Sequence, residues 1–367
     1  MKNGKSHLSY RLHQLAHLGL PSQIFIPALL QELHHEMSSI SNTFCWQDDN
    51  EKLCNIYDEM SNNDVIQKFI LSMASNGSNK YTHTTKWVSQ LDKPTTTLDY
   101  YGQCGFVGDF YKTILMPMGY FNSCFVPIFH PKTNKRLGIL MVHRAKSDKD
   151  FNHHECQYLE RVASIIAYGL IQADDEQTHT IDGWDQGLLI VDQKGNLQHS
   201  CEMGEKLLSL ASSSFFDGSL AGSVNDLHVF KGFEKLVNNL LKSNKHKSHS
   251  QNPTLSTSND WGEFKLRGFL IKDKVGKRAP RIGLNIRWQE PFVLKLFHRI
   301  KTLDLTPRQE TVGLLYAAGD PYQDIADKLH LSLYTVKEHI RNISNRIDIR
   351  SRADLIQLLL CDNPSAF

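Results

Sequence analysis

The chain has 367 residues, too many for one ordinary hydrophobic core, which predicts two or three domains. Hydrophobic residues make up 40% and charged residues 22%, a balance that excludes a disordered or fibrous protein. The 41 basic and 39 acidic side chains give a net charge of +2, so a generally polycationic nucleic-acid coat is excluded. Any basic surface must therefore be local.

Targeting and cysteine patterns also bound the function. No apolar segment follows the N-terminal Met-Lys-Asn-Gly-Lys, so we expect no secretory signal and a cytoplasmic protein. The longest uncharged run, near 113–131, contains Pro117 and Pro127 and predicts buried strands, not a membrane span. The seven cysteines are odd in number and contain no CxxC pair, so we expect reduced thiols, no metal site and no cofactor.

The first domain is expected over residues 1–175. Leucines at helical spacing predict a helix over 6–18, and a second helix is expected to start at Pro27. Alternating segments separated by turn residues predict two hairpins, 41–46 with 53–57 and 124–129 with 137–143. Asn152 and Glu155 form a capping box at the start of a helix with one apolar face. This domain is therefore predicted as an antiparallel sheet flanked by helices.

A second α+β domain is expected over 182–290. Its predicted elements are strands at 187–191 and 197–199, helices at 202–211 and 226–241, and a hairpin of 264–271 with 282–288. The stretch 242–260, rich in Ser, Asn, His, Lys and Thr, predicts a disordered insert. Residues 291–302 predict a connector helix that leads to a C-terminal domain.

Four helix starts lie close together in the C-terminal domain, residues 303–367. Each start carries a capping residue: Thr306, Asp320, Ser332 and Ser351. A three-residue turn, 330–332, separates a short helix from one with isoleucines on one side and polar residues on the other. This arrangement predicts a helix-turn-helix, and with the preceding domains an α+β fold class: antiparallel-sheet sensor domains followed by four helices.

Charge supports a nucleic-acid interface, because residues 332–352 hold five basic side chains against two acidic ones. Bases are read near the start of the recognition helix, which nominates Lys337, Glu338 and Arg341. Hydroxyl, amide and guanidinium groups on the same flank are expected to contact phosphates. These are Ser332, Tyr334, Thr335, Asn342, Arg346, Arg350 and Arg352.

The same region resembles the LuxR-type DNA-binding domain over about 303–360. The resemblance rests on Leu305-Thr-Pro-Arg308, Gly319, Ile325-Ala326, Leu329, Leu331-Ser332 and Thr335-Val-Lys-Glu-His-Ile-Arg-Asn-Ile343. It implies a bacterial transcription regulator that binds double-stranded promoter DNA, with the last helix able to contribute to a homodimer, and it leaves a contact with RNA polymerase open. Two departures are Gly313, in place of a large apolar residue, and the acidic Glu338.

Residues 24–172 resemble a GAF-type sensor through Phe110-Tyr-Lys-Thr, Met118-Gly-Tyr, Val126-Pro-Ile, Leu137-Gly-Ile-Leu-Met-Val-His-Arg144 and Phe151-Asn-His-His-Glu155. Residues 184–288 resemble a PAS-type sensor through Gly187-Leu-Leu-Ile-Val-Asp192. Aromatic side chains cluster between 98 and 125 and either line a small-molecule pocket or fill the core. The pocket interpretation nominates Tyr100, Tyr101, Phe106, Phe110, Tyr111 and Tyr120.

Two functions follow. The first is a homodimeric transcriptional regulator controlled by a ligand or partner, and the alternative is a sensory module whose helical C-terminal domain docks a partner protein. No phosphate-binding glycine loop, nucleophile elbow or paired carboxylates are found, so the chain is not expected to be an enzyme.

Overall fold

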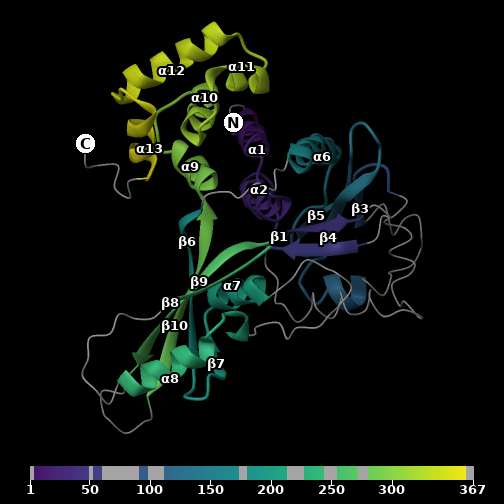
Figure 1. Ribbon diagram of the computed structural model, residues 1–367. Helices are drawn as coiled ribbons and strands as arrows, with labels where there is room; N and C mark the ends of the chain where they lie inside the picture. Colours follow the sequence, from purple (N-terminus) through teal and green to yellow (C-terminus); the bar gives the residue numbers. More distant parts are fainter. Residues whose placement is uncertain are drawn as a thin grey trace. The chain divides into compact units, whose positions relative to one another are not determined.

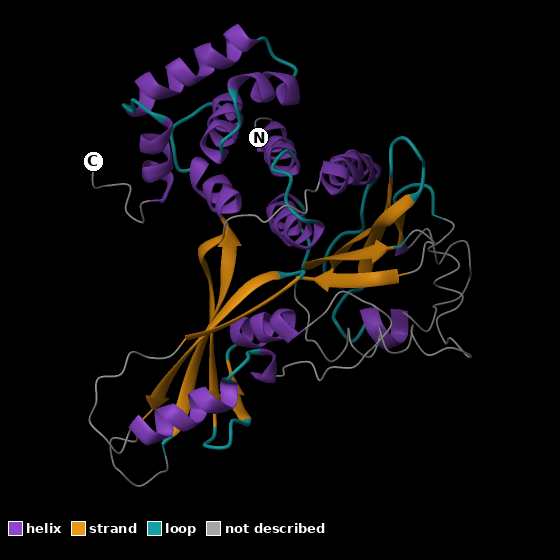
Figure 2. Ribbon diagram, viewed as in Figure 1, coloured by secondary structure: helices purple, strands orange, loops and turns teal. Residues whose placement is uncertain are grey.

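A computed structural model describes residues 4–48, 53–59, 91–97, 111–172, 180–212, 227–243, 254–271 and 280–360 (Figures 1 and 2). The chain forms two compact units. One contains the N-terminal helices, the first sheet and the C-terminal helices, and the other contains residues 180–290. Antiparallel sheets in the N-terminal regions and an all-helical C-terminal region confirm the predicted α+β fold class.

Among the described residues, helices α1 (Gly4–Ala16), α2 (Ser22–Glu36) and α6 (His153–Gln172) accompany the first sheet. The prediction that the second helix starts at Pro27 was wrong, because α2 begins five residues earlier and contains this proline. Pro27 is the sixth residue of α2 and costs one i→i−4 hydrogen bond, but apolar residues on both sides of it, including Phe25, Ile26, Leu29 and Leu30, are buried and hold the helix in place. At the start of α6 the predicted capping box is confirmed, since Asn152 Oδ1 accepts from Glu155 N at 3.1 Å and Glu155 Oε2 accepts from Asn152 N at 2.9 Å.

The first sheet has the strand order β2-β1-β5-β4-β3 and is antiparallel throughout the described pairs. Its strands are β1 (Ser41–Gln47), β2 (Leu53–Asp58), β3 (Thr95–Thr96), β4 (Asn122–Phe129) and β5 (Arg136–Arg144). Both predicted hairpins are confirmed, and the pairing of β1 with the central strand β5 joins them. Successive side chains alternate between faces, so Asn42 points to α2 while Thr43 points to the opposite face.

The second unit contains another antiparallel sheet, in the order β7-β6-β10-β9-β8. Its elements are β6 (Thr180–Val191), β7 (Leu197–Ser200), α7 (Glu202–Ser212), η2 (Leu227–Val229), α8 (Phe233–Ser243), β8 (Thr254–Asn259), β9 (Gly262–Ile271) and β10 (Arg281–Pro291). The hairpin of β9 and β10 was predicted and is confirmed.

Part of the predicted disordered insert, 242–260, is ordered. Residues 254–259 form β8, an edge strand paired with β9, so the prediction was wrong for this part, and residues 244–253 lie outside the described residues. The segment Thr-Leu-Ser-Thr-Ser-Asn has too few large apolar residues to signal a strand. An edge strand with one exposed face needs few of them, because the backbone pairing supplies its order.

Five helices complete the first unit: α9 (Phe292–Ile300), α10 (Pro307–Ala318), α11 (Tyr322–Leu329), α12 (Leu333–Ile347) and α13 (Arg352–Leu360). Thr306 caps α10 in the predicted capping box with Gln309. The predicted cap at Asp320 was wrong, because Pro321 occupies the N-cap of α11 and the Asp320 carboxylate pairs with Lys328 Nζ at 2.8 Å. None of the helices in the described part of the chain has the length and hydropathy needed to cross a bilayer.

Candidate nucleic-acid interface and sensor site

The turn between α11 and α12 sets the direction of the recognition helix. His330 ends α11 in the left-handed conformation at φ 51°, and the Leu331 N–H donates to the Ala326 carbonyl at 2.8 Å. Two residues later the Ser332 hydroxyl accepts from Thr335 N at 3.0 Å and caps α12. The predicted helix-turn-helix is confirmed, and its turn is held by hydrogen bonds at both helix ends.

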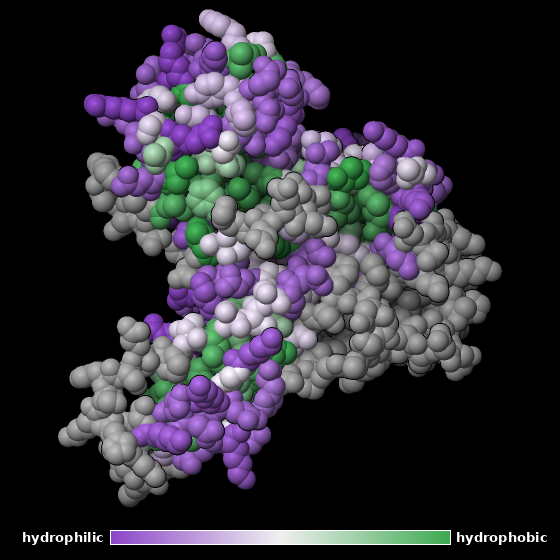
Figure 3. All heavy atoms as spheres, in the orientation of Figure 1, coloured by the Kyte–Doolittle hydropathy of each residue, from purple (hydrophilic) through white to green (hydrophobic). Residues whose placement is uncertain are grey.

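α12 is anchored from behind by an apolar stripe. Val336 is fully buried, and Ile340 and Ile343 are 9% and 1% exposed. A Cβ at Gly313 in α10 would lie 3.4 Å from Ile343 Cδ1 and 3.6 Å from Ile300 Cδ1, which is ordinary van der Waals contact. The space beside Gly313 is lined by isoleucines of α9 and α12. The opposite flank of α12 faces outward, and hydrophilic side chains predominate over α11 and α12 in Figure 3.

The three residues nominated for base reading share this outward flank. The Lys337 side chain is exposed. Arg341 Nη2 lies 2.8 Å from Glu338 Oε1, and their side chains are 70% and 35% exposed. The acidic charge that departs from a purely basic reading surface is thus paired with the arginine one helical turn away.

The nominated phosphate contacts divide into exposed and engaged side chains. Tyr334 is 77% exposed at the start of α12, and Ser332, Asn342 and Arg350 are exposed. Thr335 is half-buried, and its hydroxyl lies 2.8 Å from Ser332 Oγ. Their assignment to phosphates stays a prediction.

Two arginines of the same set already have partners within the domain. Arg346 Nη2 lies 2.7 Å from Asp304 Oδ2. Arg352 donates to the carbonyls of Gly319 and Asp320 at 2.9 and 2.8 Å, and its guanidinium lies 4.4 Å from the centroid of the Tyr316 ring. Arg352 therefore ties α13 to the end of α10, a structural contact that sequence reasoning did not identify.

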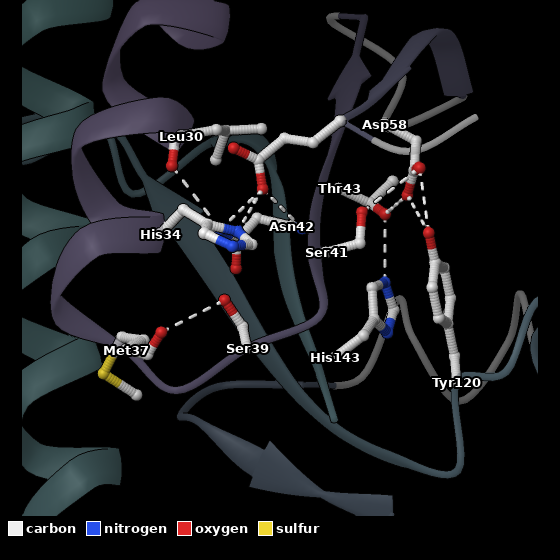
Figure 4. A network of polar contacts seen from close by, with 11 residues as sticks. Leu30, His34, Met37, Ser39, Ser41, Asn42, Thr43, Asp58, Tyr120 and His143 are labelled. Atoms are coloured by element: carbon white, nitrogen blue, oxygen red, sulfur yellow. Dashed lines mark hydrogen bonds and ion pairs between the residues drawn. The ribbon is translucent and has the colours of Figure 1, made fainter. Parts of the chain in front are cut away.

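A second group of polar side chains lies on the sheet face opposite α2, and we name it the Asp58 cluster (Figure 4). Its members are all buried: Ser41, Thr43, Asp58, Tyr120, Ser123 and His143. The Asp58 carboxylate accepts from the Tyr120 hydroxyl at 2.9 and 3.1 Å, from Ser41 at 3.3 Å and from Thr43. His143 Nε2 lies 2.9 Å from Thr43 Oγ1, and its Nδ1 lies 2.8 Å from Ser123 Oγ.

Burial and these hydrogen bonds together favour one neutral tautomer of His143. Because the Thr43 hydroxyl donates to the carboxylate, it accepts from His143 Nε2–H, and His143 Nδ1 then accepts from Ser123. The imidazole is neutral in this arrangement, and burial lowers the pKa of His143 to about 3. Burial, followed by the Asp58 charge, raises the pKa of Tyr120. The phenol ring stacks on the imidazole, with ring centroids 4.1 Å apart.

A neighbouring network joins the sheet to α2. Glu59 follows Asp58, and its Oε2 accepts from Asn42 N and Nδ2, both at 2.8 Å. The same oxygen lies 3.3 Å from His34 Nδ1 on α2, and Asn42 Nδ2 also lies 3.5 Å from the Leu30 carbonyl. Burial raises the pKa of Glu59. Glu59, the neighbour of Asp58 in the chain, therefore connects the end of β2 with α2.

Only two members of the predicted aromatic pocket can be placed. Tyr120 is 2% exposed and belongs to the Asp58 cluster. Tyr111 is half-buried in the π-helical turn η1 (Tyr111–Leu115), and its hydroxyl donates to the Phe121 carbonyl at 3.1 Å. Tyr100, Tyr101, Phe106 and Phe110 lie outside the described residues. Sequence reasoning missed Asp58 and His143, although Ser41 and Thr43, polar at alternate positions of one strand, were a signal.

Comparison with protein families identifies both regions. Residues 303–359 match the model for bacterial regulatory proteins of the luxR family, and residues 53–170 match the GAF domain model. The chain carries a LuxR-family DNA-binding domain and a GAF domain. The LuxR-family domain contains the helix-turn-helix, and the GAF domain contains most of the Asp58 cluster. This combination is that of a sensing transcriptional regulator, which confirms the predicted class of function.

Other comparisons add little. No curated protein matches the chain. One solved structure, the phage VqmA–DPO complex, is 15% identical, covers 51% of this chain and 85% of its own, and has a TM-score of 0.19. The E. coli DhaR(N)–DhaL complex is 11% identical, and the match covers 77% of this chain and 88% of that chain, with a TM-score of 0.23. The sensor region of a sensor histidine kinase is 9% identical, and the match covers 76% of this chain and 91% of that chain, with a TM-score of 0.20. These TM-scores are too low to support an argument.

Proposed function

We propose that this regulator binds double-stranded promoter DNA as a homodimer through the outward flank of α12, under the control of a small molecule or partner sensed by the GAF domain. The observation that carries the DNA interface is the division of α12 into a buried stripe of Val336, Ile340 and Ile343 and an exposed basic flank. A helix fixed by its apolar side offers the polar side to a groove without refolding.

Within this flank Lys337, Glu338 and Arg341 read bases. Lys337 and Arg341 suit the acceptors of guanine, and Glu338 suits the amino group of cytosine. The ion pair of Glu338 with Arg341 gives the two side chains a common orientation before DNA arrives. Ser332, Tyr334, Thr335, Asn342, Arg346, Arg350 and Arg352 are the proposed phosphate-side contacts, and Arg346 and Arg352 must first exchange their present partners.

The sensor end of the proposal rests on the Asp58 cluster. The buried carboxylate and hydroxyl groups on the sheet face opposite α2 can exchange their present hydrogen bonds for contacts with a polar effector that enters beside them. The nominated Tyr120 is part of this cluster. We place the proposed ligand contacts here, with Tyr111 at its edge and the remaining nominated aromatics, Tyr100, Tyr101, Phe106 and Phe110, as predictions. A contact with RNA polymerase stays a prediction.

The experiment uses the full chain. Duplexes selected from a random pool are used to measure affinity in gel-shift or anisotropy titrations at several salt concentrations. Lys337→Ala and Arg341→Ala should each weaken specific binding by about 1–3 kcal/mol without unfolding the domain. Arg350→Ala should lower the slope of log affinity against log salt by about 1 while affecting all sequences alike.

A matched control removes a positive charge elsewhere in the same region. Lys301 is exposed and close enough to Glu32 of α2 to lower the pKa of that carboxyl group, so it lies on the sensor side of the LuxR-family domain. Lys301→Ala should leave the affinity for selected DNA unchanged. Equal losses in Lys301→Ala and Lys337→Ala, or no salt-dependent DNA binding at all, would contradict the proposed interface and favour docking of a partner protein.

A further inference from the structure

The N-terminal helix α1 is joined to both sides of the regulator by one buried arginine. Arg11 is 3% exposed, and its Nε and Nη2 donate to the two carboxylate oxygens of Glu32 on α2 at 3.2 and 2.9 Å. The remaining nitrogen, Nη1, donates to the Phe297 carbonyl on α9 at 3.2 Å. The guanidinium carbon also lies 3.7 Å from the centroid of the Phe297 ring. One side chain thus connects α1, α2 and α9.

A second contact lies one helical turn along α1. Gln14 Nε2 donates to Thr311 Oγ1 on α10 at 3.0 Å, and the Thr311 hydroxyl donates to the Tyr10 hydroxyl at 2.7 Å. Gln14 and Thr311 are 2% and 4% exposed. We name the six residues Tyr10, Arg11, Gln14, Glu32, Phe297 and Thr311 the α1 joint. It links the sensor side of the chain to the first helix of the LuxR-family domain.

The contacts of Arg11 require one specific arrangement of the three helices. An apolar contact tolerates sliding, whereas a guanidinium that serves a carboxylate, a carbonyl and a ring at once has one geometry. Moving α9 away from α1 would leave a buried charge without part of its hydrogen bonding, which is costly. The joint therefore fixes the orientation of α9 and α10 relative to α2.

The joint leaves the reading surface accessible. Its contacts on the LuxR-family domain come from α9 and α10, whereas Lys337 and Arg341 of α12 are exposed. It therefore does not compete with DNA for α12. What the joint can control is the position of α12 relative to the sensor domain, and so the separation of two recognition helices in a dimer.

Contacts continue from the joint to the sensor cluster. Glu32 and His34 both lie on α2. His34 contacts Glu59, the residue that follows Asp58 at the end of β2. A rearrangement of the Asp58 cluster can therefore shift α2, and α2 carries the carboxylate that holds Arg11. The experiment therefore measures the coupling between the sensor side and the LuxR-family domain directly.

We propose that the α1 joint is the regulatory connection of this protein: when closed, it fixes the spacing at which the paired recognition helices meet DNA. This inference rests on the proposed DNA-binding function and adds the element that conveys control. The disrupting variants are Arg11→Met/Glu32→Met, which removes both buried charges together, and Thr311→Val, which keeps the shape of the side chain and removes its hydroxyl.

The chain offers a matched control. Arg144 and Glu155 form a second Arg–Glu pair at 2.7 Å, and the Arg144 guanidinium lies 4.1 Å from the centroid of the Phe151 ring. This pair joins β5 to α6 within the GAF region. Arg144→Met/Glu155→Met therefore removes an Arg–Glu pair from the sensor domain, together with the contact of Glu155 with Asn152 N at the start of α6.

The measurement compares duplexes that carry one selected half-site or two half-sites at varied spacing. Wild-type full chain should prefer one spacing over the others by about tenfold or more, because a fixed linkage engages both sites only when the geometry matches. Both joint variants should bind the single half-site within about twofold of wild type but lose most of the spacing preference, as expected for a flexible linkage. The Arg144/Glu155 control should keep it. Hydrogen exchange should increase in α9 and α10 of the joint variants only.

The outcomes separate this inference from the proposed function. If wild type shows no spacing preference, or if the joint variants keep it, the inference is overturned while specific binding that depends on Lys337 still supports the function. If wild type binds none of the duplexes, both fail. A joint variant that loses single half-site binding together with the spacing preference indicates damage to the DNA-binding domain and also overturns the inference.

Discussion

The hydrogen bonds that start helices in the LuxR-family domain and those that build the Asp58 cluster near the GAF sheet span very different ranges in the sequence. In the LuxR-family domain, the hydrogen bonds that start α10, α12 and α13 join residues three positions apart. In the Asp58 cluster, Tyr120 reaches Asp58 across 62 positions and Thr43 reaches His143 across 100. Helices that start at local caps can be predicted one by one from the sequence. A buried polar cluster that four strands bring together can be identified only from the three-dimensional structure.

The largest expected effect tests whether local signals suffice for the LuxR-family domain. Ile343→Ala leaves every cap intact but opens a cavity where Ile343 packs beside Gly313. We expect the domain to lose about 2–5 kcal/mol of stability. All five tryptophans precede residue 291, so urea denaturation followed by far-UV circular dichroism should show an early transition that tryptophan fluorescence does not follow. Coincident early transitions by both probes would mean that the two domains unfold together.

The range of the contacts also explains what the sequence could predict. Four helices, their turn and three of four caps were predicted because each signal lies within a few residues, and Asp320 failed because a lysine two turns later takes its carboxylate. Hairpins were predicted for the same reason. The pairing of β1 with β5, the Asp58 cluster and the contact of Arg11 with Phe297 depend on residues up to 286 positions apart. A local pattern such as the alternate polar residues Ser41 and Thr43 does not identify such distant partners.

A smaller loss is expected when the long-range cluster is broken. Asp58→Ala removes the acceptor of Tyr120, Thr43 and Ser41 and leaves buried hydroxyl groups unpaired. We expect a loss of about 1–3 kcal/mol, measured by urea denaturation with tryptophan fluorescence. Asp192→Ala is the local counterpart, because that exposed carboxylate accepts from backbone N–H groups two and four residues away. Asp192→Ala should lose less stability than Asp58→Ala. Equal losses in the two variants would show that the range of the contacts does not determine their effect on stability.

The pH dependence of stability should originate in the GAF domain. Burial holds the pKa of His143 at about 3 in the folded protein, below the ordinary value of 6.5. Protonation therefore favours unfolding. The contribution of neutral His143 to the free energy of unfolding is complete above pH 6.5 and is lost as the pH falls from 6.5 towards 3. Wild type should lose roughly 2 kcal/mol between pH 6.5 and 5 that His143→Asn does not lose. Parallel pH profiles of the two proteins would show that this imidazole is not the source.

The smallest effect separates the two roles assigned to Ser332. Its hydroxyl caps α12 by accepting from Thr335 N, and it is also nominated as a phosphate contact. Ser332→Ala should cost about 1 kcal/mol of stability in the LuxR-family domain, measured by circular dichroism during urea denaturation. Ser332→Asp should keep the cap, because a carboxylate accepts the same N–H group and suits the helix N-terminus.

The two variants should differ again on DNA. If Ser332 faces phosphate, Ser332→Asp is stable but binds DNA more weakly than Ser332→Ala, because its negative charge repels the backbone and the deficit shrinks as salt rises. If the residue acts only as a cap, affinity follows stability, and Ser332→Asp binds as tightly as wild type. A local signal that predicts the helix start would then say nothing about DNA, and the reading surface would have to be assigned to residues farther along α12.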